Sequence, residues 1–351
     1  MSGILAVIPS LLSGQALSAA KDLGVRRARP FAALRVTGLR SLVSCDTIMY
    51  KTVQSFFRLS KEPILERLTT HLTLAPGASI DLHMHTNYSD GRWPTQQLID
   101  FLVAEGFDLV AVTDHDRVDM VEGIQQLAAQ QHLPVLAGVE MSTEWKGKMG
   151  HVLCYGFDPE QNHLREITQM VIDQQLENTH QVYDELLRKG YQFPRQQEVL
   201  ADNDGKLRRP ADNGRLLREH GYASDWPTAM RMIREAGFRS IMADMAMTVD
   251  AAHRSGAVCL IAHPGRKEGN FTFYDLPLLD EVRADVPLDG IEVYHPYHSP
   301  EMVQAYLEYV RKHNLLLSTG SDSHSLPGRM PMKYRAEISR DLLERVGILV
   351  A

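Results

Sequence analysis

Cysteine is scarce in this sequence, and the cysteines present follow no ligand or disulfide spacing. Cys45, Cys154 and Cys259 are the only three among 351 residues. An odd number of widely separated thiols argues against the disulfide framework of a small secreted domain. The apolar segments around Cys154 and Cys259 instead predict small buried side chains. A reducing, cytoplasmic environment fits this usage.

Long apolar runs and excess positive charge are also missing. No stretch of about 18 uninterrupted apolar residues occurs, so the sequence predicts no transmembrane helix and no membrane contact. The chain has 37 Lys and Arg against 44 Asp and Glu, a net charge of −7. An acidic chain does not hold double-stranded nucleic acid by charge alone. A phosphorylated partner must therefore meet a local basic pocket or bound cations.

The N-terminal segment differs in composition from the rest. Residues 1–48 contain six Lys or Arg against two Asp, and include the apolar stretch ILAVIPSLLSGQALSAA and the Arg-rich stretch VRRARPFAALRVTGLR. No positive segment precedes the apolar stretch, which argues against a signal peptide, whereas an Arg-rich, acid-poor stretch is typical of transit peptides. A disordered leader, or an overlong translation whose true start is Met49, fits at least as well. We predict that residues 1–48 are a dispensable leader and that residues 49–77 form an N-terminal extension.

From residue 78 onward, short apolar runs alternate with amphipathic stretches. SIDLHMH is followed by PTQQLIDFLVAEG, and FDLVAVTD is followed by DMVEGIQQLAAQQ. Strands that alternate with helices predict parallel β/α units and an α/β fold. Seven strands can be counted over residues 78–159 and 251–351, which suggests a distorted barrel. Residues 160–250 contain no good strand, so we expect a helical insertion there that caps the barrel.

Histidine and carboxylate side chains stand at the ends of these predicted strands. In IDLHMHTNYSDG, residues 80–91, His83 and His85 share one strand face and Asp90 follows in the loop. The carboxyl ends of barrel strands converge on one rim, so such donors should meet. The nine strongest candidates are His83, His85, Asp90, His115, Glu140, His151, His263, Asp322 and His324. All are nitrogen or oxygen donors, which suit Mn²⁺, Zn²⁺ or Fe²⁺, and nine are too many for one tetrahedral ion. Two or three ions that share a carboxylate fit the count.

Together these motifs resemble the PHP (polymerase and histidinol phosphatase) domain family. DLHMHTNYSDG, AVTDHD, GVEMS, GHVLCYGF, AHPGR, EVYHPYHS and GSDSH occur in the family's order. The resemblance implies a distorted seven-stranded β/α barrel with up to three metals, of which Mn²⁺ is the most suitable. It implies one metal held by His83, His85, Glu140 and Asp322, a second bridged by Glu140 and held by His151 and His263, and a third held by Asp90, His115 and His324.

The insertion resembles one branch of this family, described as 3′,5′-nucleoside bisphosphate phosphatases and 5′→3′ exoribonucleases that act on short RNA. The resemblance implies a small phosphorylated substrate or a short 5′-phosphorylated RNA. The insertion segment KLRRPADNGR lacks the histidine that the branch usually carries there. Arg208, Arg209 and Arg215 of this segment are placed to bind a second phosphate if the loop folds over the rim.

The side chains around the reacting phosphate can be assigned roles from their chemistry. Arg266, which follows AHPG, suits bidentate binding of phosphate oxygens. We expect the metals bridged by Glu140 to neutralise the phosphate and to activate the attacking water. Asp116, His295 and His298 are the candidates to protonate the leaving oxygen or to contact the substrate. The sequence does not choose among these three.

Other functions remain open at this stage. A histidinol-phosphate-type or other small-molecule phosphomonoesterase would use the same chemistry, although the insertion argues mildly against it. A metal-dependent amidohydrolase has a similar barrel and H-x-H opening, but no lysine follows a barrel strand where a carbamylated bridge would be needed. A non-catalytic metal-binding regulator would require broken ligands, and all nine are present. The oligomeric state is not predicted.

Overall fold

The computed structural model describes residues 68–267, 271–326 and 328–351. The predicted leader and most of the predicted N-terminal extension lie outside the described residues. The strands are β1 (Thr73–Leu74), β2 (Ser79–Asp81), β3 (Leu109–Val110), β4 (Gly138–Trp145), β5 (Lys148–Tyr155), β6 (Ala243–Asp244), β7 (Val258–Ile261), β8 (Gly290–Tyr294), β9 (Leu316–Thr319), β10 (Tyr334–Arg335) and β11 (Leu349–Val350). The helices are α2 (Thr95–Ala104), α3 (Val121–Ala129), α4 (Leu164–Arg188), α5 (Gln196–Val199), α6 (Pro210–Glu219), α7 (Trp226–Glu235), α8 (Met245–Arg254), α9 (Leu276–Asp285), α10 (Pro300–His313) and α11 (Arg340–Arg345).

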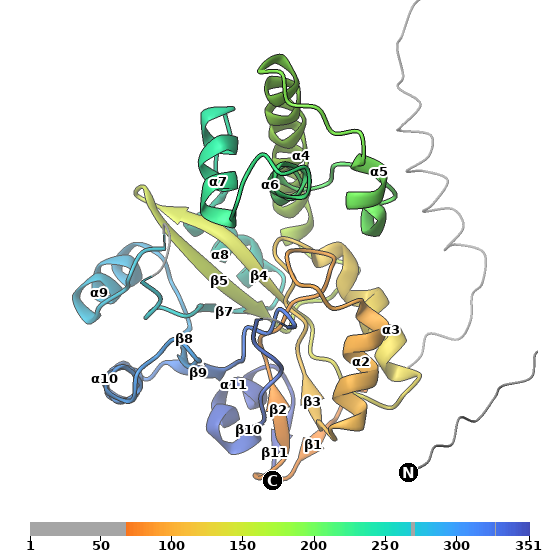
Figure 1. The fold of residues 1–351 in the computed structure, drawn as a ribbon. Helices are drawn as coiled ribbons and strands as arrows, with labels where there is room; N and C mark the ends of the chain where they lie inside the picture. The colour runs from red at the N-terminus through yellow and green to blue at the C-terminus, as the bar shows by residue number, and fades with distance from the viewer. Residues whose placement is uncertain (1–67, 268–270, 327) are drawn as a thin grey trace, which may run out of the picture. The chain divides into compact units, whose positions relative to one another are not determined.

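Within the described residues the strands form three sheets, of order β1–β11, β10–β2–β3 and β6–β4–β5–β7–β8–β9 (Figure 1). The pairs β2–β3, β7–β8 and β8–β9 are parallel, and a helix connects the strands of each pair in the chain. This mixed architecture confirms the predicted α/β class. Isolated parallel bridges link Met84 to Ser323 and His115 to Glu140, and each joins segments that belong to different sheets. The strand ends that carry the predicted ligands therefore meet.

β4 and β5 form an antiparallel hairpin, which the expectation of parallel units did not include. Trp145 pairs with Lys148, so the turn consists of Lys146 and Gly147, whose φ angles are 50° and 74°. Two central residues with positive φ define a type I′ turn, whose twist matches that of the flanking strands. β5 is also antiparallel to β7. This direction explains why His151 stands at the start of its apolar run, whereas the other predicted ligands follow theirs.

Helices α4 to α7 form a layer with a hydrophobic core of its own (Figure 1). Asp225 caps the N-terminus of α7, because its side chain accepts a hydrogen bond from the Thr228 N–H at 2.8 Å. The apolar residues of α7 pack on α6. One strand was missed: β6 lies within residues 160–250 and pairs in parallel with β4. Two residues are too few to show the alternation that predicts a strand. The division into barrel and insertion stays a prediction.

α4 is the longest helix in the described residues, and charged side chains occur along it. Neither α4 nor another helix of the described residues combines the length and apolarity needed to cross a membrane.

Candidate metal centre

Glu140 stands at the centre of the predicted ligands. It lies on β4 and is fully buried. Its Oε2 is 2.9 Å from His83 Nε2 and 3.0 Å from His85 Nε2. Its Oε1 is 2.8 Å from both His151 Nδ1 and His263 Nε2. A carboxylate whose two oxygens face separate pairs of histidines has the arrangement that a ligand shared by two ions requires.

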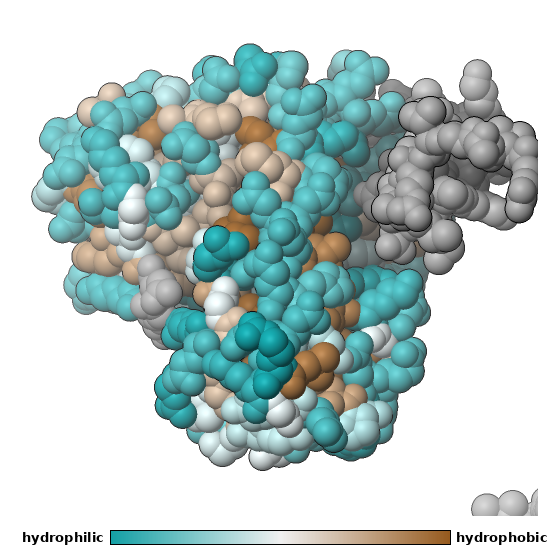
Figure 2. All heavy atoms as spheres, turned by 90° about the horizontal axis from the view of Figure 1, so that it is seen from above, coloured by the Kyte–Doolittle hydropathy of each residue, from teal (hydrophilic) through white to brown (hydrophobic). Residues whose placement is uncertain are grey.

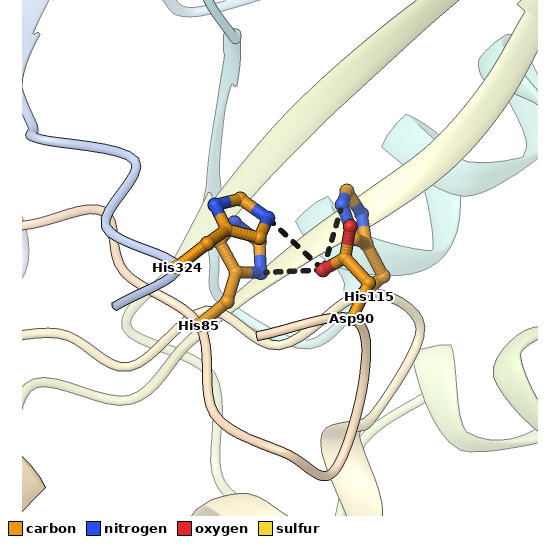
Figure 3. Close-up of side chains that lie close together, drawn as sticks. All are labelled: His85, Asp90, His115 and His324. Atoms are coloured by element: carbon orange, nitrogen blue, oxygen red, sulfur yellow. Dashed lines mark hydrogen bonds and ion pairs between the residues drawn. The ribbon is translucent and has the colours of Figure 1, made fainter. Parts of the chain in front are cut away.

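Asp322 and Asp90 complete two further groups. Asp322 Oδ1 lies 3.2 Å from His85 Nε2 and 3.4 Å from His324 Nδ1. Asp90 Oδ1 lies 3.0 Å from His324 Nε2 and 3.8 Å from both His85 Nδ1 and His115 Nε2 (Figure 3). The structure thus brings all nine predicted ligands together. His85 faces both groups through different nitrogens, which the sequence did not indicate.

Burial and charge set the protonation of this centre. Burial raises the pKa of Glu140, but His115 and His83 beside it hold that pKa well below its ordinary value. Burial lowers the pKa of His263 to about 4, which leaves its ring neutral. Burial also lowers the pKa of His83, but Glu292 and Glu140 raise it well above the ordinary value. The buried carboxylates therefore require positive charge, which protons or divalent ions can supply.

The residues present fit divalent metal ions. In the described residues, three buried ring nitrogens of this region have no hydrogen-bond partner, namely His85 Nδ1, His115 Nδ1 and His295 Nε2. An unpartnered buried polar atom costs free energy unless a ligand or water satisfies it. The clusters of side chains that could hold an ion here contain only imidazole and carboxylate. Such donors suit Mn²⁺, Zn²⁺ and Fe²⁺.

The backbone is strained where it places these side chains. His263, Asp322 and Asp116 have φ angles of 28°, 50° and 55°. Residues other than glycine rarely adopt this conformation, and it persists where the surrounding structure enforces it. Gly320 serves a different need, because a Cβ at this position would lie 2.2 Å from the Cβ of His83. Only glycine lets the loop after β9 approach the ligand this closely.

Glu292 is a residue of the centre that the sequence analysis missed. It lies on β8 and is fully buried. Its Oε1 accepts a hydrogen bond from His83 Nδ1 at 2.9 Å, and its Oε2 accepts one from the His263 N–H at 2.7 Å. A carboxylate that receives the Nδ1 proton keeps Nε2 available for a metal. The available signal was one acidic residue between the apolar Ile291 and Val293.

The three candidates for the general acid lie in different surroundings. Asp116 lines the cavity described below, and burial raises its pKa to about 6. His295 is buried and packs against the ring of His263. His298 does not line that cavity. Its Nδ1 donates to the Val293 carbonyl at 2.8 Å, and its Nε2 accepts from the Gly265 N–H at 3.0 Å. Both ring nitrogens of His298 therefore already form hydrogen bonds within the protein, and its substrate contact stays a prediction.

A cavity of about 920 Å³ adjoins the ligand cluster and reaches helices α4, α6 and α7. Asp90, His115 and Asp322 form part of its wall, while Ile172 of α4 and Trp226 of α7 form an apolar part. Its wall also contains six arginines, which are Arg117, Arg208, Arg209, Arg239, Arg266 and Arg329. Seen from the side of the insertion helices, hydrophobic atoms are exposed among hydrophilic ones (Figure 2). The cavity therefore combines positive charge with apolar surface in a chain that is acidic overall.

The insertion arginines do not all face this cavity. Arg208 lines it and is exposed, and its ion pair with Asp204 is long, at 3.4 Å. Arg209 also lines it, but its guanidinium donates to the Ser89 carbonyl. Arg215 does not line it and instead forms two bonds of 2.9 Å to Asp202. The structure therefore does not place Arg215 at the cavity, because its guanidinium bonds Asp202 and the Val199 carbonyl instead.

Arg266 has the surroundings expected of an anion-binding group. Its guanidinium carbon lies 3.7 Å from the ring centre of Phe271 and 5.2 Å from that of Tyr297. Its Nε is buried and has no hydrogen-bond partner in the described part of the chain. Aromatic rings hold the guanidinium in place without using its N–H groups. These donors remain available to a ligand in the cavity.

Comparison with known proteins finds a family match and relatives of this chain. The family model described as PHP domain matches residues 81–237. A 3′,5′-nucleoside bisphosphate phosphatase from Chromobacterium violaceum is 28% identical over 263 residues, which cover 72% of this chain and 88% of that protein. A 5′-3′ exoribonuclease from Haemophilus influenzae is 24% identical over 249 residues, which cover 70% of this chain and 89% of that protein.

Solved structures show the same fold. A proposed metal-dependent phosphoesterase from Bifidobacterium adolescentis aligns with a TM-score of 0.65 and 24% identity, covering 77% of this chain and 97% of that chain. An amidohydrolase from Chromobacterium violaceum, with bound sulfate and no metal, aligns with a TM-score of 0.63 and 26% identity, covering 76% of this chain and 97% of that chain.

The fold and the ligand cluster define a metal-dependent phosphoesterase. Residues 81–237 match the PHP domain, and the chain is similar over most of its length to enzymes named as a phosphatase and an exoribonuclease. The ligands that follow residue 237 lie beyond the matched stretch, but they occupy the same centre.

Proposed function

We propose that this enzyme hydrolyses phosphate from nucleoside 3′,5′-bisphosphates or from short 5′-phosphorylated RNA. The cavity is the observation that carries the proposal. It joins the ligand cluster to six arginines and to an apolar wall built largely from the insertion. A small phosphomonoester needs only the cluster and one cation. A substrate with two phosphates and a flat, partly apolar base uses the whole cavity.

Two or three divalent ions fit the nine donors, and Mn²⁺ is our first choice. Such ions would polarise the phosphate ester, neutralise its charge and lower the pKa of water. Arg266 would orient the reacting phosphate, because its side chain lines the same cavity as the ligand Asp322 and its Nε has no hydrogen-bond partner among the described residues. Asp116 is favoured over His295 to protonate the leaving oxygen, since Asp116 lines the cavity.

The second phosphate would meet Arg208. This side chain is exposed at the cavity, and its contact within the insertion is weak. Arg209 is less available, because it already bonds the loop that carries Asp90. The names of the two curated relatives, a nucleoside bisphosphate phosphatase and an exoribonuclease, support a substrate with more than one phosphate or with an RNA body.

Hydrolysis of a C–N bond is the alternative that one comparison favours, because a similar structure is named an amidohydrolase. In the described residues no lysine lines the cavity, so a carbamylated lysine bridge has no source there. Glu140 occupies the position between the two pairs of histidines instead. A histidinol-phosphate-type phosphatase stays the alternative within phosphate chemistry.

The test is a substrate screen on metal-stripped protein resupplied with Mn²⁺, Zn²⁺ or Fe²⁺. Phosphate release is measured for adenosine 3′,5′-bisphosphate, sugar phosphates, histidinol phosphate and 5′-phosphorylated RNA oligomers, and ammonia release for simple amides. We expect kcat/KM to be highest for the bisphosphate or the RNA. The His83→Ala variant, purified identically, controls for contaminating phosphatases. Preference for a simple monoester, or ammonia release alone, would refute the proposal.

A further inference from the structure

We propose that Arg329 is a positioning residue for Asp322 and so determines how tightly the centre binds divalent ions. The inference rests on the proposed function only in that both require ions at this centre. Arg329 belongs to none of the sequence motifs that predicted the ligands. It lies in the loop after β9, near the ligand in sequence but outside the ligand set.

The two oxygens of Asp322 face different neighbours. Oδ1 lies 3.7 Å from His83 Nε2 and 3.2 Å from His85 Nε2. Oδ2 accepts a hydrogen bond from Arg329 Nη2 and lies 3.4 Å from His295 Nε2. Arg329 therefore holds the carboxylate in the rotation that directs Oδ1 toward the ligand histidines. A partner of this kind orients a ligand and reduces the entropy lost when an ion binds.

The same guanidinium holds the backbone of this loop. Arg329 Nε donates to the Ser321 carbonyl at 2.9 Å, and Nη2 donates to the Asp322 carbonyl at 2.9 Å. Asp322 has a φ of 50°, a strained conformation for a residue with a Cβ. Three acceptors on one planar group match the fork of an arginine, whereas the single nitrogen of lysine cannot span them.

Arg329 is itself fixed before any ligand binds. Ser323 Oγ donates to the Arg329 carbonyl at 2.8 Å and accepts from Trp93 Nε1 at 3.2 Å. The guanidinium carbon lies 4.5 Å from the ring centre of Tyr297. Arg266 provides a matched control, since it faces the same ring at 5.2 Å and lines the same cavity. Among the described residues no hydrogen bond or ion pair joins Arg266 to Asp322.

The sign of the effect separates positioning from charge. Loss of a positive charge beside a cation site should by itself tighten Mn²⁺ binding, because like charges repel. Loss of a positioning residue should weaken it. Arg329→Gln is therefore expected to weaken the binding of at least one Mn²⁺ by about tenfold or more. Arg266→Gln removes the same charge from the same cavity and should leave Mn²⁺ affinity equal or higher.

The experiment titrates metal-stripped full-length protein with Mn²⁺ by calorimetry, for the wild type, Arg329→Gln, Arg329→Lys and Arg266→Gln. We expect the Mn²⁺ affinity of Arg329→Lys to lie between that of the wild type and that of Arg329→Gln. In phosphate release, raising the Mn²⁺ concentration should restore kcat for Arg329→Gln, whereas Arg266→Gln should show a raised KM at every Mn²⁺ concentration.

Melting temperatures of the metal-free proteins establish that each variant is folded, and if Arg329→Gln is not, Arg329→Lys carries the comparison. Mn²⁺ affinity equal to wild type in a folded Arg329 variant would overturn the inference. Equal weakening in Arg266→Gln would overturn it too, because the effect would then belong to the cavity as a whole. If the wild type releases no phosphate, but Arg329→Gln still binds Mn²⁺ more weakly than the wild type, only the proposed function is refuted.

Discussion

Replacement of Glu292 by Gln tests whether this buried carboxylate controls the centre. Glu292 accepts from the ring of His83 at 2.9 Å and from the backbone N–H of His263 at 2.7 Å. In the variant, the amide oxygen can remain on the His263 N–H, which turns the amide NH₂ toward His83 Nδ1. His83 Nδ1 must then accept, so the ring proton moves to Nε2. A protonated Nε2 cannot bind a metal.

The magnitude follows from the loss of one oriented ligand. Removal of a partner that orients a metal-binding histidine typically lowers metal affinity by about 10- to 100-fold. This corresponds to about 1.4 to 2.7 kcal/mol of binding free energy. The upper end applies here, because Glu292 is fully buried and water cannot replace it. Turnover at limiting Mn²⁺ should fall by the same factor.

Mn²⁺ titration and phosphate release measure this effect, and Asp289→Asn is the matched control. Asp289 likewise accepts from a histidine ring, at 2.7 Å from His253, and from a backbone N–H, at 2.8 Å from Cys259. It is not part of the ligand cluster around Glu140. We expect Asp289→Asn to lower the melting temperature without weakening Mn²⁺ binding. Glu292→Gln protein that binds Mn²⁺ as tightly as the wild type would refute the reasoning.

Three further outcomes are expected. The Asp322→Ala variant should bind at least one metal equivalent fewer by metal analysis, and its turnover in phosphate release should fall by more than about 100-fold. Full activity of the variant with chelator present would contradict this expectation. Arg208→Ala should raise KM for a bisphosphate and leave kcat and simple monoesters unchanged, whereas Arg209→Ala should affect both substrates. A double-mutant cycle of Arg215→Ala and Asp202→Asn, measured by urea unfolding, should show a coupling free energy of about 0.5 kcal/mol or less, because both side chains are about a third exposed. Neither variant should change KM. Burial raises the pKa of Asp202, but its hydrogen bond from Arg215 lowers it below the ordinary value, so this coupling should be present at neutral pH and vanish as the pH falls through the lowered pKa.

The chemistry of the centre could be predicted from local sequence. The two-residue period of a strand places His83 and His85 on one face, and the strand-end positions of Glu140 and His263 follow from short apolar runs. The α/β class follows from the same alternation of strands and helices. The antiparallel β4–β5 hairpin has a local signal, a two-residue Lys-Gly turn between β-rich runs, which the prediction of parallel units did not use.

Glu292 and Arg329 could not be assigned in this way. Glu292 is 209 residues from His83 in sequence, and a single acid in an apolar strand is not distinguishable from a structural one. Arg208 and Arg215 stand in the same segment with the same side chain, yet one faces the cavity and the other bonds Asp202. Local sequence therefore determined which side chains can bind metal and which strand ends carry them. Only the tertiary structure decided which carboxylate and which arginines reach that centre, because the direction of each side chain depends on acceptors contributed by distant segments of the chain.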